Sequence, residues 1–137
     1  MFTKIMIPVD LRHVDRMEKA LTIAAGLARQ YGAEAHITGV TVSTPTEVAR
    51  TPKAYADKLA AFAAETSETH GVTFTPHAEI SHDASIDLDD ILSRTADKIG
   101  ADLIVMASHV PGFADRFMSS NAGYLASHAH ISVFVVR

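Results

Sequence analysis

Apolar runs of strand length alternate along this chain with longer segments in which apolar residues recur at helical spacing. Residues 5–9 and 102–107 are apolar at nearly every position, which is typical of strands covered on both faces. Residues 17–31 instead carry a stripe of apolar side chains one helical turn apart, with most charged residues off the stripe. This alternation predicts an α/β fold, an open parallel sheet with helices on both faces and right-handed crossovers.

Glycine, proline and threonine mark the expected ends of these elements. Gly32 and Gly100 stand where helix C-caps would be, and Thr51-Pro52 is typical of an N-cap followed by proline at the first helical position. Pro76 favours an edge strand, because proline cannot donate to a strand ladder. The expected order is strand 5–9, helix 17–31, strand 35–42, helix 52–70, strand 72–80, helix 88–99, strand 102–107, helix 120–129 and strand 131–136.

The composition narrows the class of protein. A chain of 137 residues has the size of one compact domain, which we expect to span residues 1–137. The absence of cysteine excludes disulfides, thiolate metal ligands and a cysteine nucleophile. A net charge of -4 argues against non-specific nucleic-acid binding, and no apolar run approaches the ~20 residues that span a bilayer. The N-terminus lacks the pattern of a signal peptide, so we expect a cytoplasmic protein that binds neither nucleic acid nor membranes.

In open parallel sheets, ligands bind beyond the carboxyl ends of strands, at the point where the strand order reverses. This rule directs attention to residues 8–10, 40–41 and 106–121. The Asp10 carboxylate could accept a hydrogen bond from a ribose hydroxyl or from an adenine amino group. The alternative interpretation is a turn residue or a helix cap, roles that aspartate fills well.

A phosphate-binding loop is the next feature that such a site requires. Neither a P-loop nor a Gly-x-Gly-x-x-Gly fingerprint follows the first strand. Residues 107–112, followed by 119–122, are the better candidate, because small hydroxyl residues and backbone N–H groups at a helix N-terminus can hold anionic oxygens. The alternative is that residues 119–121 only cap the last helix. His109 lies in the same loop, where it could contact a ligand.

Other site chemistries find less support in the sequence. A phospho-acceptor receiver domain needs an acidic pair after the first strand, where only Asp10 is available. It also needs an aspartate after the third strand, where Asp83 stands, and a lysine after the fifth, where none matches. The histidines at 128 and 130, and the set at 77, 82 and Asp83, lack the spacing of a metal site. No serine stands in a nucleophile elbow, and no carboxylate pair ends two strands. We therefore expect neither a catalytic residue nor a metal site.

Several segments resemble the universal stress protein family, in its small single-domain bacterial form. They are Ile5–Asp10, Gly100–His109 and a C-terminal pattern that runs from residues 119–122 through 128–129 to 132–137. The resemblance spans the whole chain and implies a five-stranded parallel sheet in the order 3-2-1-4-5, Rossmann-like and of the adenine nucleotide alpha hydrolase-like type. It also implies a homodimer formed by pairing of the last strands, with an interface at Ile131, Val133, Phe134 and Val135.

The same resemblance implies an adenine nucleotide at the switch point between the first and fourth strands. The residues that would contact it are, in chain order, Pro8, Val9, Asp10, Val40, Met106, Ala107, Ser108, His109, Val110, Ser119, Ser120 and Asn121. ATP-binding members usually have glycine where this chain has Ala107, Val110 and Ser119, and each replacement adds a Cβ near the phosphates. A branch of small bacterial members reads Ser-His-x-Pro and later Gly-Ser-Asn-Ala, and this chain matches that branch more closely.

The resulting expectation is a cytoplasmic protein of the universal stress type that binds ATP, ADP or AMP as a homodimer. Its role would be sensing or regulation in a stress response, with at most slow ATP hydrolysis. Asp115 and Arg116 are the only formal charges between residues 108 and 130, so a triphosphate would need backbone donors and a cation such as Mg²⁺. The alternative is a nucleotide-independent dimeric interaction module with a degenerate site.

Overall fold

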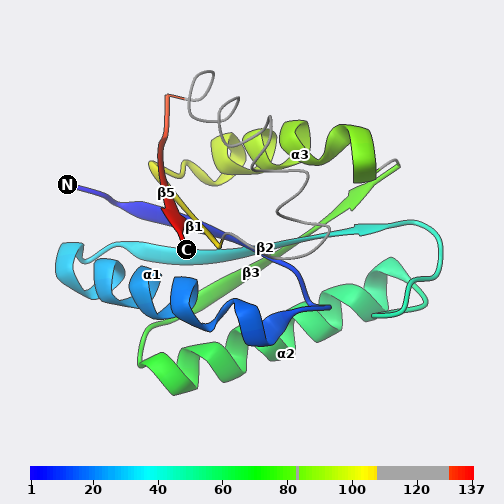
Figure 1. Cartoon of the computed structure of the whole chain (residues 1–137), viewed down its shortest axis with the longest axis horizontal. Helices are drawn as coiled ribbons and strands as arrows, with labels where there is room; N and C mark the ends of the chain where they lie inside the picture. Colours follow the sequence, from blue (N-terminus) through cyan, green and yellow to red (C-terminus); the bar gives the residue numbers. More distant parts are fainter. Residues whose placement is uncertain (83, 108–129) are drawn as a thin grey trace.

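The computed structural model describes residues 1–82, 84–107 and 130–137, which fold around a five-stranded parallel sheet (Figure 1). The strands lie in the order β3-β2-β1-β4-β5, which confirms the predicted order. In chain order the elements are β1 (Lys4–Val9), the short 3-10 helix η1 (Val14–Arg16), α1 (Glu18–Tyr31), β2 (Glu34–Val42), α2 (Pro52–His70), β3 (Phe74–Ser81), α3 (Ala84–Ile99), β4 (Leu103–Ala107) and β5 (Ser132–Val136). None of the described helices has the length and apolar character needed to cross a bilayer.

Two of the predicted caps are present: one at the C-terminus of α1 and one at the N-terminus of α2. Gly32 follows α1 with a φ of 64°, a left-handed conformation that glycine adopts without the steric cost of a Cβ. The Thr51 hydroxyl accepts a hydrogen bond of 3.0 Å from the backbone N–H of Ala54, and Pro52 occupies the first turn of α2. These local signals set the helix ends independently of the tertiary fold.

The largest differences between the structure and the sequence prediction lie at three places. The 3-10 helix η1 was not predicted, because it holds only three residues and carries no apolar stripe. Strand β3 begins at Phe74 rather than at residue 72, since the Phe74 N–H is still bonded to the Ser67 hydroxyl of α2 at 2.8 Å. Helix α3 begins at Ala84 rather than at residue 88. The helix expected over residues 120–129 lies outside the described residues.

Helices α1 and α2 cover one face of the sheet and α3 covers the other, so the core has two layers (Figure 1). Successive residues of β1 point to opposite faces. Ile5, Ile7 and Val9 therefore pack with α1 and α2, whereas Met6 packs with α3 and with Ile104 of β4. This double burial explains the continuous apolar run in β1.

Helix α2 lies so close to β2 that one position of the strand has no room for a side chain. A Cβ on Gly39 would stand 2.4 Å from the Tyr55 phenol oxygen and 3.1 Å from Leu59. Tyr55 is only 4% exposed, so its ring has little space into which it could retreat. Glycine at 39 thus sets the distance between α2 and the carboxyl half of β2.

A pair of histidines joins β2 to β3 on the α3 side of the sheet. The Nδ1 atom of His36 lies 2.8 Å from Nε2 of His77, and Nε2 of His36 lies 3.1 Å from the Glu34 carboxylate. Burial is the largest cause that lowers the pKa of His77, and the positive charge of His36 lowers it further; Glu79 raises it by a smaller amount, and Lys98 lowers it by less again. If His36 and His77 were both protonated, two cations would be in contact on the α3 side of the sheet. The folded state therefore disfavours protonation of both rings.

We predict that Gly39→Ala lowers the free energy of unfolding by about 1–3 kcal/mol, because the added methyl group overpacks the contact with Tyr55. Gly26→Ala in α1 is the matched control. No atom lies within 4 Å of its added Cβ, so better helix propensity should raise stability by roughly 0.5–1 kcal/mol. Urea unfolding of the two variants measures both values, and equal effects would contradict the close approach.

We also predict that stability falls as the pH drops below about 6.5. The pKa of His77 is lowered in the folded state from its ordinary 6.5, so the folded chain binds fewer protons there than the unfolded chain. His77→Gln keeps a hydrogen-bonding group for His36 but cannot titrate, and it should flatten this dependence. The free energy of unfolding, measured from about pH 7.5 to pH 5, tests this, with exposed His130→Gln as the control. A slope that His77→Gln leaves unchanged would disprove the assignment.

Candidate functional site

The parallel strands all end on one side of the sheet, which we call the carboxyl edge to distinguish it from the outermost strands β3 and β5. At the carboxyl edge, β1 lies between β2 and β4. Pro8 and Val9 of β1 pair with Thr38 and Gly39 of β2, so β1 ends beside the middle of β2, which continues to Val42. Chain segments leave this edge toward opposite faces, because α1 follows β1 on one face and α3 follows β3 on the other. This is the strand-order reversal at which open sheets bind ligands.

The structure places half of the predicted contact residues at this edge. Pro8, Val9 and Asp10 are buried at the end of β1, and Val9 packs on the α1 and α2 side together with Ala107. Val40 and Met106 lie on the other face, in the cluster beneath α3. The remaining predicted contacts, Ser108, His109, Val110, Ser119, Ser120 and Asn121, lie outside the described residues.

The side chain of Asp10 is the most constrained polar group at the edge. It is only 7% exposed. Its Oδ1 accepts hydrogen bonds from the backbone N–H and from Nε of Arg12, both at 3.0 Å, and its Oδ2 accepts from an Nη of Arg12 at 2.9 Å. The Nδ1 atom of His13 lies 3.3 Å from the same Oδ2.

The chain after β1 folds locally so that these donors converge on Asp10. The His13 N–H donates to the Asp10 carbonyl at 3.0 Å, which closes a turn over residues 10–13, and η1 follows directly. Within this turn the aspartate side chain accepts the N–H two residues on, a conformation that aspartate favours. Asp10 is therefore a turn residue, one of the two interpretations that the sequence left open, and its buried carboxylate is held by donors of the same turn.

Asp10 is ionised at neutral pH. Burial by itself raises the pKa of the Asp10 carboxyl, but the hydrogen bonds and the positive charge of Arg12, with a smaller effect of His13, outweigh burial and hold the pKa below its usual range. Burial raises the pKa of the nearby Tyr55 phenol, and the negative charge of Asp10 raises it further, so Tyr55 stays protonated. The edge therefore presents one buried anion and one neutral phenol.

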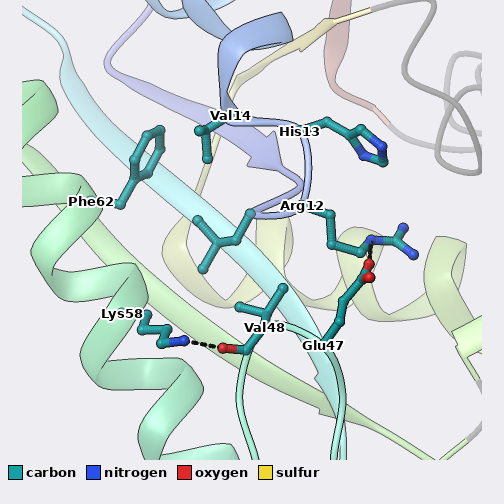
Figure 2. Close-up of a pocket in the computed structure, with 8 residues that line it drawn as sticks. Arg12, His13, Val14, Glu47, Val48, Lys58 and Phe62 are labelled. Atoms are coloured by element: carbon teal, nitrogen blue, oxygen red, sulfur yellow. Dashed lines mark hydrogen bonds and ion pairs between the residues drawn. The ribbon is translucent and has the colours of Figure 1, made fainter.

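A pocket of about 540 Å³ opens between the segment after β1, the connection from β2 to α2, and α2 itself (Figure 2), and none of the predicted contact residues that the structure describes lines it. The guanidinium of Arg12 turns toward Glu47, with Nε 4.0 Å from Oε1, and the Lys58 ammonium contacts the Val48 carbonyl oxygen. The residues that line the pocket are Leu11, Arg12, His13, Val14, Glu47, Val48, Lys58 and Phe62.

The sequence analysis missed Arg12, His13 and Glu47. Arg12 stands two residues after Asp10, the position whose N–H an aspartate side chain accepts in a turn, so the spacing contained a usable signal. Glu47 lies in the connection after β2, and no local pattern relates it to Arg12. Among the described residues, no group of three or more His, Asp or Glu side chains is arranged to hold a metal ion.

Comparison with known proteins assigns this architecture. The chain matches the profile of the Usp family, the Universal stress protein family, over residues 1–137. Universal stress protein G of Shigella flexneri is 27% identical over 143 residues, which cover 100% of each chain.

Two solved structures have the same fold. The crystal structure of a universal stress protein in complex with cAMP has a TM-score of 0.69 at 18% identity, and the match covers 99% of this chain and 97% of that one. The universal stress protein from Archaeoglobus fulgidus in complex with dAMP has a TM-score of 0.66 at 20% identity, with 98% of each chain covered. The sheet thus has the adenine nucleotide alpha hydrolase-like fold, as predicted.

Proposed function

Since the chain belongs to the universal stress protein family, we propose that it binds an adenine nucleotide at the carboxyl edge of the sheet, between β1 and β4. The contacts proposed among the described residues are Pro8, Val9, Asp10, Val40, Met106 and Ala107. Ser108, His109, Val110, Ser119, Ser120 and Asn121 complete the proposed set, as the loop around the phosphates. The ligands of the two solved relatives, cAMP and dAMP, support this proposal.

The observation that carries the proposal is the buried, ionised carboxylate of Asp10 at the end of the central strand. A buried anion is stable only with hydrogen-bond donors around it; Arg12 and His13 supply them in the empty protein, and the hydroxyls of a ribose are donors of the same kind. Val40 is partly buried and offers apolar surface near the same edge, of the kind that suits the face of a purine ring, whereas Met106 is only 2% exposed and lies beneath α3. The ends of β1 and β2 therefore combine an acceptor for the sugar with an apolar residue for the base.

The phosphates are the less favourable part of the ligand. Ala107, Val110 and Ser119 replace glycines of ATP-binding members, and the segment between residues 108 and 130 contains one acidic and one basic residue. We therefore propose binding of ATP, ADP or AMP through backbone donors, with Mg²⁺ for the longer phosphate chains. The proposed role is sensing or regulation in a stress response, with at most slow ATP hydrolysis. If the protein binds no nucleotide, a dimeric interaction module with a degenerate site is the remaining interpretation.

We predict that Asp10→Asn weakens adenine nucleotide binding on the order of tenfold, because an amide accepts hydrogen bonds less strongly than a carboxylate. Isothermal calorimetry with ATP, ADP and AMP, each with and without Mg²⁺, measures the effect. The matched control is Asp57→Asn in α2, whose carboxylate is 69% exposed and pairs with Lys53. The proposal fails if the unmodified protein gives no binding heat, no thermal shift and no co-purified nucleotide.

We further propose a homodimer formed through β5. This strand is the last of the described strands at one side of the sheet, next to β4 only, and its large apolar side chain Phe134 is 43% exposed. Val133 and Val135 are partly buried on the strand, and Ile131 precedes it. If β5 pairs with β5 of a second copy, its exposed apolar side chains are covered and its unpaired backbone N–H and C=O groups form hydrogen bonds.

We predict that Phe134→Glu converts the dimer into a monomer, because the carboxylate would be buried in the strand pair. Ile80→Glu is the matched control, since Ile80 is 50% exposed on β3, at the opposite edge of the sheet. Sedimentation velocity of the three proteins distinguishes the species. A monomeric parent chain, or a Phe134→Glu variant that stays dimeric, would exclude this interface.

A further inference from the structure

The Asp10 carboxylate has no acceptor site left for a ligand. A carboxylate offers about four lone-pair positions. Two donors of Arg12, the backbone N–H and Nε, occupy Oδ1, while an Nη of Arg12 and the His13 ring occupy Oδ2. A ribose hydroxyl can bond to Asp10 only after one of these donors has left.

The guanidinium of Arg12 is the charged donor that can leave; the His13 ring, 3.3 Å from Oδ2, is the longer and weaker contact. The backbone N–H of Arg12 is part of the turn closed by the His13 N–H, so its departure would unfold the turn. The Arg12 side chain is 44% exposed, whereas that of Asp10 is 7% exposed, so the guanidinium covers the carboxylate from the solvent side. Its departure requires a side-chain rotation and no change in the strand.

A second carboxylate is ready to receive the displaced charge. The Oε1 atom of Glu47 lies 4.0 Å from Nε of Arg12, and the Glu47 side chain is 73% exposed at the pocket wall (Figure 2). The guanidinium thus stands between a buried carboxylate and an exposed one. Rotation toward Glu47 would open Asp10 and keep Arg12 paired.

We propose that Arg12 is an internal competitor of the ligand, whose guanidinium closes Asp10 in the empty protein and is displaced toward Glu47 when a ribose binds. This inference rests on the proposed nucleotide function and adds a regulating residue to the same site. The closed pair neutralises a buried anion while the site is empty, which stabilises the empty protein. It also lowers the apparent affinity by the fraction of molecules in which Asp10 is open.

Adenosine is the sharpest probe of this competition, because it carries the ribose hydroxyls and no phosphate that Arg12 could attract. We predict that Arg12→Gln binds adenosine on the order of tenfold more tightly than the parent protein, since the ligand no longer displaces a charge-assisted pair. Arg12→Lys keeps the charge but loses the two-pronged geometry, so its affinity should fall between the two. Lys53→Gln in α2 is the control, because it removes one positive charge that is 87% exposed and pairs with Asp57.

The outcomes separate the competitor from the nucleotide function. If the parent protein binds adenosine and Arg12→Gln binds it equally or more weakly, the competitor is disproved and the nucleotide function stands. If neither protein binds adenosine or any adenine nucleotide, the nucleotide function fails, and the competitor fails with it. Tighter adenosine binding by Arg12→Gln, with Lys53→Gln unchanged, supports both.

A second measurement follows Arg12 itself in the unmodified fold. In ¹H–¹⁵N spectra, the Nε–H of a guanidinium held on a carboxylate exchanges slowly with water, and we expect this for Arg12 in the empty protein. Saturation with adenosine should shift that resonance toward the position of an exposed arginine. A resonance that stays unchanged at saturation would overturn the displacement, even if Arg12→Gln proved too unstable to titrate.

Discussion

Strand β1 is hydrogen-bonded to a neighbour on both sides and buried on both faces, and the rest of the fold is arranged around this one element. Its register with β2 and β4 determines which residues reach the carboxyl edge together. Because the chain must leave the sheet directly after Val9, the next residue lies at the strand-order reversal. The position of Asp10 is therefore a consequence of sheet topology, and its chemistry depends on what the following turn brings to it.

The turn after β1 places the positive charge of Arg12 on the negative charge of Asp10. Asp10 is buried enough that ionisation alone would be unfavourable, and Arg12 compensates from two residues away through both its backbone and its side chain. The same contacts that make the empty edge stable also occupy the atoms that a sugar would use. In the proposed mechanism, the contacts that stabilise the empty site oppose ligand binding at one carboxylate, and the exposed Glu47 receives the displaced guanidinium.

Much of the fold follows from local signals. The stripe of α1, the cap at Thr51 and the glycine after α1 were recognisable because each depends on residues within one helical turn. Pro76 placed β3 at an edge for an equally local reason, the missing backbone donor. The 3-10 helix was not recognisable because it has only three residues. The exact start of β3 was not recognisable because it depends on the hydrogen bond from the Phe74 N–H to the Ser67 hydroxyl of α2.

The sequence by itself determined the alternation of strands and helices, the double burial of β1 and the placement of an aspartate at its end, because these depend on residue type and spacing along the chain. The tertiary structure decided that Arg12 and His13 close this aspartate and that Glu47 faces Arg12 from another connection. It also decided that Tyr55 crosses β2 at Gly39. These contacts depend on where separate segments meet in space, and no periodicity or local motif encodes such distances.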